Sequence, residues 1–91
     1  MRIMDIDYGT EETVIVVKDT LSGTLKSKTY NKHEFLTTEE LFKHLANMVK
    51  NLSVDYVLID TRAYGMVAYD YLKTSDIGDR VVGLKSEGKL W

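Results

Sequence analysis

The chain has 91 residues, about the length of one domain. Hydrophobic residues make up 44% and charged residues 29%, an ordinary globular composition that excludes a disordered or fibrous chain. A net charge of −2 argues against a polybasic nucleic-acid or membrane binder. Cysteine is absent, which excludes disulfides and thiolate metal sites. Without a long apolar segment or signal-peptide pattern, we expect a soluble cytoplasmic protein that does not bind membranes.

The first thirty residues predict three strands, at Arg2–Asp7, Thr13–Val17 and Thr24–Tyr30. The middle strand is a β-branched run that is too short for a helix. The connecting segments contain Gly9 and Gly23 and are short, so neighbouring strands should pair antiparallel. These residues therefore predict a three-stranded meander.

An amphipathic helix is predicted over Thr38–Leu52. Thr37 and Glu40 have the spacing of a capping box at its start. The two histidines, His33 and His44, lie off the apolar stripe, and we expect them to be solvated or in a loop. The stripe follows the helical period and consists of Leu41, Phe42, Leu45, Met48, Val49 and Leu52.

The second half of the chain predicts a strand, a helix and a further strand. They lie at Tyr56–Asp60, Tyr64–Thr74 and Arg80–Leu84, and a polar tail follows over Ser86–Trp91. The apolar run before Asp60 is typical of a buried strand in a parallel arrangement, so we expect this strand to lie parallel to the first and next to it. The predicted fold is a single α/β domain over residues 1–91, with a mixed sheet of about five strands in the order β-β-β-α-β-α-β.

Two aspartates are the strongest candidates for a functional site. Asp7 ends the first strand and Asp60 ends the fourth, so the predicted pairing of these strands would bring the two together. A buried carboxylate needs a partner, and Mg²⁺ or Mn²⁺ prefers carboxylate oxygens. The alternative is that Asp7 opens a turn and Asp60 caps the following helix. The spacing of the residues leaves both interpretations open.

Other candidate features have simpler explanations. Lys26, Lys28 and Lys32 form a basic stretch on an outer strand, which is typical of a solvated edge that resists aggregation. Asp76 and Asp79 flank a glycine and are interpreted as turn residues. Tyrosines on the second predicted helix could stack on bases, although their spacing favours packing.

Three stretches resemble the nuclease domain of the large terminase subunits of tailed bacteriophages, which has a ribonuclease-H-like fold. They are Met4–Val17, Val57–Gly65, and Val67–Leu72 leading to Val81–Gly83. The resemblance implies that Asp7 and Asp60 are two of three catalytic carboxylates that bind a pair of Mg²⁺ or Mn²⁺ ions for phosphodiester hydrolysis. Asp5 would be an outer carboxylate of that site.

The resemblance covers only about the first half of the family's domain. The third carboxylate has no position in the sequence, because neither Asp79 nor Glu87 lies where it is needed. The family's packaging ATPase is absent as well. We therefore expect a phage or prophage protein of the bacterial host cell, whose Mg²⁺- or Mn²⁺-dependent DNA cleavage in genome packaging is weak or absent.

Two other classes of protein fit the same residues. The first is a non-catalytic, phage-derived interaction module that binds a phage or host protein through a sheet edge or its second helix. The other is an unrelated α/β module in which Asp7 and Asp60 serve only in a turn and a helix cap. Cleavage of DNA with Mn²⁺ would separate the enzyme from both.

Overall fold

A computed structural model of the chain describes residues 1–84. The strands and α-helices follow the predicted order, and their ends lie within about two residues of the predicted ones. Two short 3-10 turns, η1 and η2, were not predicted. The predicted polar tail lies outside the described residues. In chain order the elements are β1 (Arg2–Tyr8), β2 (Glu12–Asp19), β3 (Leu25–Asn31), η1 (Lys32–Glu34), α1 (Thr38–Asn51), β4 (Tyr56–Asp60), α2 (Gly65–Lys73), η2 (Gly78–Arg80) and β5 (Val81–Leu84).

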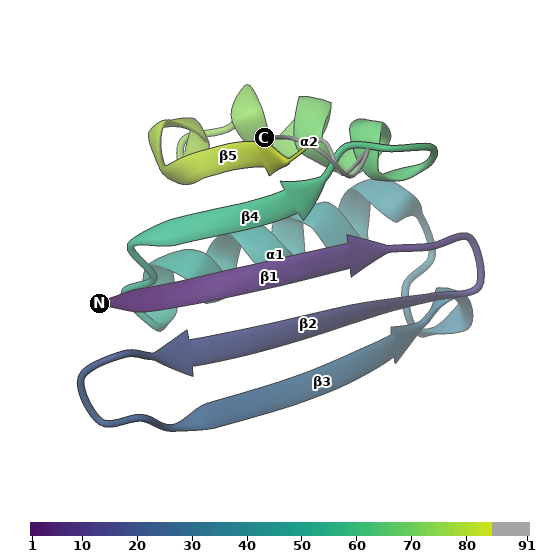
Figure 1. Cartoon of the computed structure of the whole chain (residues 1–91). Helices are drawn as coiled ribbons and strands as arrows, with labels where there is room; N and C mark the ends of the chain where they lie inside the picture. The colour runs from purple at the N-terminus through teal and green to yellow at the C-terminus, as the bar shows by residue number, and fades with distance from the viewer. Residues whose placement is uncertain (85–91) are drawn as a thin grey trace.

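The five strands form one mixed sheet in the order β3-β2-β1-β4-β5 (Figure 1). The meander pairs antiparallel, whereas β4 runs parallel to both β1 and β5. The predicted position of the fourth strand, parallel to the first and beside it, is therefore confirmed. Its apolar residues account for this position, because Val57 and Ile59 are fully buried between the sheet and the helices.

Both α-helices pack on one face of the sheet, and the core lies between these two layers (Figure 1). Thr37 Oγ1 accepts a hydrogen bond from the Glu40 N–H at 3.2 Å, which fixes the start of α1 where the capping box predicted it. The core side chains come from alternate strand positions and from one stripe of each helix. The largest fully buried ones include Met4, Ile15, Leu45, Val49, Val57, Ile59, Leu72 and Ile77.

His44 is half-buried, so its expected solvated position is wrong. Its Nε2 lies 3.1 Å from the Tyr30 hydroxyl, and its ring packs against Phe35 at a centroid distance of 5.4 Å. An apolar stripe does not reveal such a residue, because the partners of His44 come from β3 and the segment before α1.

The opposite face of the sheet has no helix on it within residues 1–84 (Figure 1). Because side chains alternate along a strand, this face carries the residues between the core positions. In β1 and β4 these include Asp5, Asp7 and Asp60. None of the helices in the described part of the chain is long and apolar enough to cross a membrane.

Candidate metal site

Asp7 and Asp60 lie at corresponding positions of two adjacent parallel strands. The last paired positions of β1 and β4 are Ile6 and Ile59, and each aspartate is the next residue of its strand. Ile6 and Ile59 are buried against the helices, so alternation directs both carboxylates to the open face. Neighbouring strands lie about 4.8 Å apart, which makes the two aspartates neighbours at the carboxyl end of the sheet.

Asp5 lies on the same face, two residues before Asp7. It is half-buried and pairs across the sheet with Val16 on one side and Leu58 on the other. Its surroundings are therefore more apolar than those of Asp7. Asp5 is therefore placed to act as an outer carboxylate of a site formed by Asp7 and Asp60.

The carboxylate of Asp60 is held by Arg62. The Arg62 Nη2 donates to Asp60 Oδ2 at 3.0 Å, and Nε lies 3.2 and 3.3 Å from the two oxygens. The backbone N–H of Arg62 adds a bond of 3.0 Å to Oδ1. The sequence analysis did not identify Arg62 as part of the site. Its position two residues after Asp60, which ends β4, could have indicated an ion pair between them.

The alternative role of Asp60 as a helix cap is wrong. The N-cap of α2 is Tyr64, and no side chain caps this helix. Asp7 lies inside β1 opposite Val14, and the turn after it closes between Gly9 N and Glu12 O at 3.1 Å. Both aspartates therefore occupy strand positions.

A glycine brings the start of α2 close to the end of β4. A Cβ atom at Gly65 would lie 1.8 Å from the carbonyl oxygen of Asp60, a distance that no side chain tolerates. Ala63 in the same connection has a φ of 49°, a left-handed conformation that favours glycine. The β4–α2 connection is thus tightly fitted around the backbone of Asp60.

Within residues 1–84, no group of three or more histidines, cysteines, aspartates or glutamates is placed to hold a metal ion. Asp76 is paired with Lys50 at 2.7 Å, and the hydrogen bond from this lysine lowers the pKa of Asp76. The donors of the candidate site are oxygens, which suits a hard divalent cation. Asp7 and Asp60 could supply ligands for one such ion, and Asp5 could contribute an outer carboxylate.

Of the three tyrosines in and just before the second helix, two pack against the core and one is exposed. Tyr71 packs against Phe42 with ring centroids 5.3 Å apart. Tyr69 is also partly buried against the core, whereas Tyr64 is 58% exposed. An exposed stacking surface of three tyrosines is therefore not formed.

No protein-family model and no curated protein matches this chain. Solved structures that are similar to it include the following three. Pelota from Archaeoglobus fulgidus is 15% identical, with a TM-score of 0.61 over 97% of this chain and 28% of that protein. Fowlpox virus resolvase, solved with Holliday junction DNA, is 16% identical, with a TM-score of 0.57 over 100% of this chain and 64% of the resolvase. The Ppx/GppA phosphatase of Aquifex aeolicus is 17% identical, with a TM-score of 0.52 over 96% of this chain and 36% of the phosphatase.

These similarities establish the fold and not an activity, because the identities are so low. The chain spans between 28% and 64% of the length of these proteins. None of the three is a terminase. The described residues form a small α/β domain with a mixed five-stranded sheet of the ribonuclease-H-like type.

Proposed function

We propose that this chain is the metal-binding half of a ribonuclease-H-like nuclease domain. Asp7 and Asp60 hold one Mg²⁺ or Mn²⁺ ion, and Asp5 serves as an outer carboxylate of the same site. The observation that carries this proposal is the parallel pairing of β1 with β4, which brings the two aspartates together on the open face. The resolvase similarity supports it, because that protein has the same type of fold and was solved with DNA.

The proposed partner of the site is DNA. A divalent ion at this place would supply a Lewis acid for phosphodiester hydrolysis. Asp7 would be a direct ligand, since it is exposed and its position in β1 is fixed by its pairing with Val14 of β2. Asp60 would become a ligand once Arg62 moves from its carboxylate. The terminase resemblance extends the proposal to DNA cleavage during phage genome packaging.

Two aspartates are too few for a two-metal site, which must hold two cations about 4 Å apart against their repulsion. We therefore propose that the isolated chain binds Mn²⁺ weakly and cleaves DNA slowly or not at all. A second protein, or another copy of the chain, would have to supply the third carboxylate for full activity.

The second candidate function is a non-catalytic module that binds a phage or host protein. The ion pair of Asp60 with Arg62 favours it, because the guanidinium already neutralises one proposed ligand. In that function Asp60 would stabilise the β4–α2 connection through Arg62, and neither aspartate would bind a metal.

Calorimetric titration with Mn²⁺ tests the two functions. We expect Asp7→Asn and Asp60→Asn each to weaken binding several-fold, and the double variant to abolish it. Asp79→Asn is the matched control, since this aspartate is exposed and lies in η2. Unchanged binding in the double variant would favour the interaction module. Strong Mn²⁺-dependent nicking of plasmid DNA by the purified monomer would contradict the incomplete site.

A further inference from the structure

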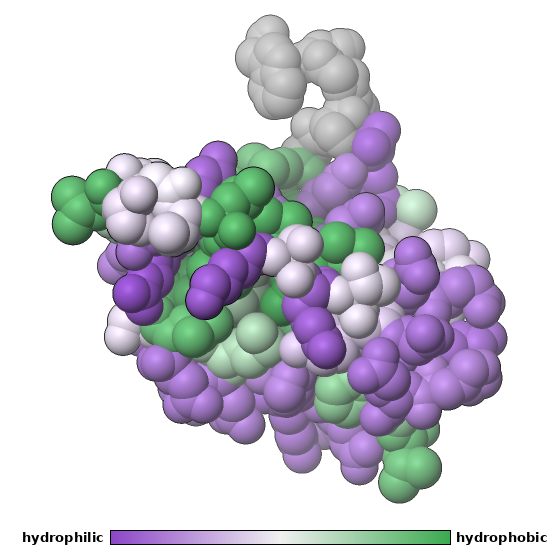
Figure 2. Space-filling model, turned by 90° about the horizontal axis from the view of Figure 1, so that it is seen from below, coloured by the Kyte–Doolittle hydropathy of each residue, from purple (hydrophilic) through white to green (hydrophobic). Residues whose placement is uncertain are grey.

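A cavity lies on the other side of the sheet from the aspartates, between the meander and α1. It has a volume of about 410 Å³ and lies beside the edge strand β3. Figure 2 looks onto this edge and shows apolar surface set back between hydrophilic side chains. Its volume falls in the range of pockets that bind small molecules.

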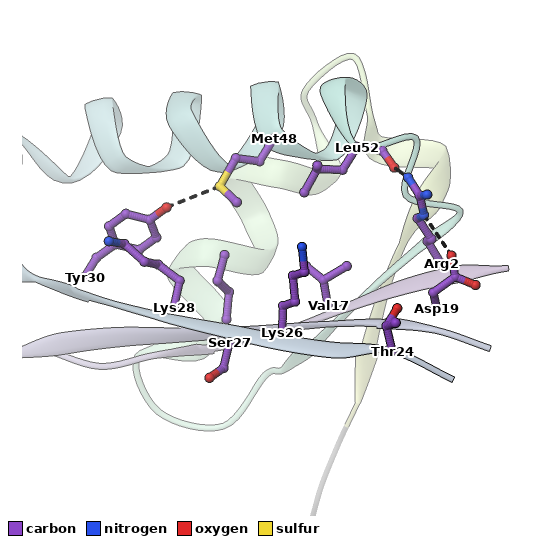
Figure 3. A pocket seen from close by; sticks show the side chains of 11 residues that line it. Arg2, Val17, Asp19, Thr24, Lys26, Ser27, Lys28, Tyr30, Met48 and Leu52 are labelled. Carbon is purple, nitrogen blue, oxygen red and sulfur yellow. Dashed lines mark hydrogen bonds and ion pairs between the residues drawn. The ribbon is translucent and has the colours of Figure 1, made fainter. Parts of the chain in front are cut away.

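The walls of this β3–α1 pocket are largely apolar. Val17 comes from β2, and it faces Met48 of α1 and Leu52, the residue that follows this helix (Figure 3). Leu52 remains 37% exposed, and Met48 and Val17 are only partly buried against the core. An apolar group placed here would therefore remove further apolar surface from water.

Both ends of the pocket are closed by hydrogen bonds. At one end the Tyr30 hydroxyl donates to Met48 Sδ at 3.3 Å (Figure 3). At the other end Arg2 Nη1 donates to the Leu52 carbonyl oxygen at 2.6 Å, and its Nε donates to Asp19 at 3.1 Å. The shape therefore favours a ligand of limited length that enters from the β3 side.

Two lysines stand at the entrance. Lys26 and Lys28 are two residues apart on β3, so their side chains leave the same face about 6.6 Å apart. The Lys26 ammonium points into the space below α1, and the Lys28 ammonium lies 5.5 Å from the centroid of the Tyr30 ring (Figure 3). Neither lysine takes part in any of the ion pairs formed within residues 1–84.

We propose that this pocket binds a small anionic amphiphile, with its carboxylate or phosphate head at Lys26 and Lys28 and its apolar body against Val17, Met48 and Leu52. A neutral apolar ligand would cover the ammonium groups without compensating their charge, which is unfavourable. An anionic head supplies that charge at the pocket entrance. The binding is independent of the proposed metal site, because the aspartates lie on the opposite face.

Titration calorimetry with decanoate and with decyl phosphate tests the proposal and distinguishes the two headgroups. We expect at least one of them to bind, and decanol and decyltrimethylammonium to bind at least ten-fold more weakly. Raising the salt concentration should weaken binding, because the ammonium groups are near solvent. Decanol or the cationic amphiphile binding as tightly as both anions would overturn the proposal.

Two variants localise the ligand. The double variant Lys26→Met, Lys28→Met keeps the length of both side chains and should weaken binding by about ten-fold. Val17→Phe should fill the slot and also weaken binding. Lys43→Met is the matched control, since Lys43 lies on α1 outside the pocket and pairs with Glu39. Unchanged affinity in the double lysine variant, with its fold verified by circular dichroism, would refute the site. So would tight binding of an acidic peptide where neither anionic amphiphile binds.

Discussion

Arg62 and Asp60 form a forked ion pair at the carboxyl end of β4, with Nη2 and Oδ2 3.0 Å apart. The Arg62 backbone N–H donates to the other carboxylate oxygen, so a residue only two positions away binds both oxygens of the carboxylate. The side chains of Arg62 and Asp60 are 60% and 40% exposed. Solvent screens such a pair, and its contribution to the free energy of unfolding should be small.

The first prediction is that Arg62→Gln strengthens Mn²⁺ binding about three- to ten-fold. The substitution removes a cation that competes with the metal ion for Asp60, while stability should change by less than about 1 kcal/mol. Titration calorimetry measures the affinity and urea unfolding the stability. Lys43→Gln removes the same positive charge from an exposed position on α1, and it should leave the affinity unchanged. Weaker or equal Mn²⁺ binding in Arg62→Gln would mean that Asp60 is not a metal ligand.

The second prediction concerns the buried stripe of α1. Leu45 is fully buried, so Leu45→Ala should lower the free energy of unfolding by about 2–4 kcal/mol through lost burial and a residual cavity. Lys43→Ala, on the exposed side of the same helix, should change it by less than about 0.5 kcal/mol. Urea titration of both variants provides the measurement. Equal losses would contradict the packing of α1 on the sheet.

Most of the fold could be predicted because each element carries a local signal. The capping residues fixed the start of α1, and the apolar run of β4 indicated its central place beside β1. The two 3-10 turns carry no periodic pattern, since each is only three residues long, and they were missed. The half-buried position of His44 depends on contacts with a strand and a loop, which no local pattern contains.

The candidate site could be predicted only in part. The neighbouring positions of Asp7 and Asp60 follow from strand order, and strand order follows from hydrophobic pattern and crossover handedness. The ion pair with Arg62 depends on the side-chain rotamers of both residues, which no sequence pattern specifies. The β3–α1 pocket depends on how far α1 extends over the sheet, which sequence periodicity does not specify.

The third prediction concerns the β4–α2 connection. Gly65→Ala should destabilise the fold by about 1–3 kcal/mol, because its Cβ would clash with the Asp60 carbonyl oxygen and backbone must move. Ala63→Gly, the opposite change in the same connection, should be neutral or slightly stabilising, since Ala63 has a positive φ. Thermal unfolding compares the two. A loss of stability in Ala63→Gly as large as that in Gly65→Ala would contradict the described connection.

The last prediction concerns acid stability. The hydrogen bond from Arg2, followed by those from the backbone N–H groups of Ser22 and Leu21, lowers the pKa of Asp19. The folded protein therefore binds this proton less tightly than the unfolded chain, so the stabilisation is present above the unfolded pKa of about 3.9 and is lost as the pH falls below it. Asp19→Asn should make the free energy of unfolding fall less steeply between about pH 5 and pH 3, measured by urea titration. The same pH dependence in Asp19→Asn as in the parent protein would mean that the Asp19 pairing does not contribute to acid sensitivity.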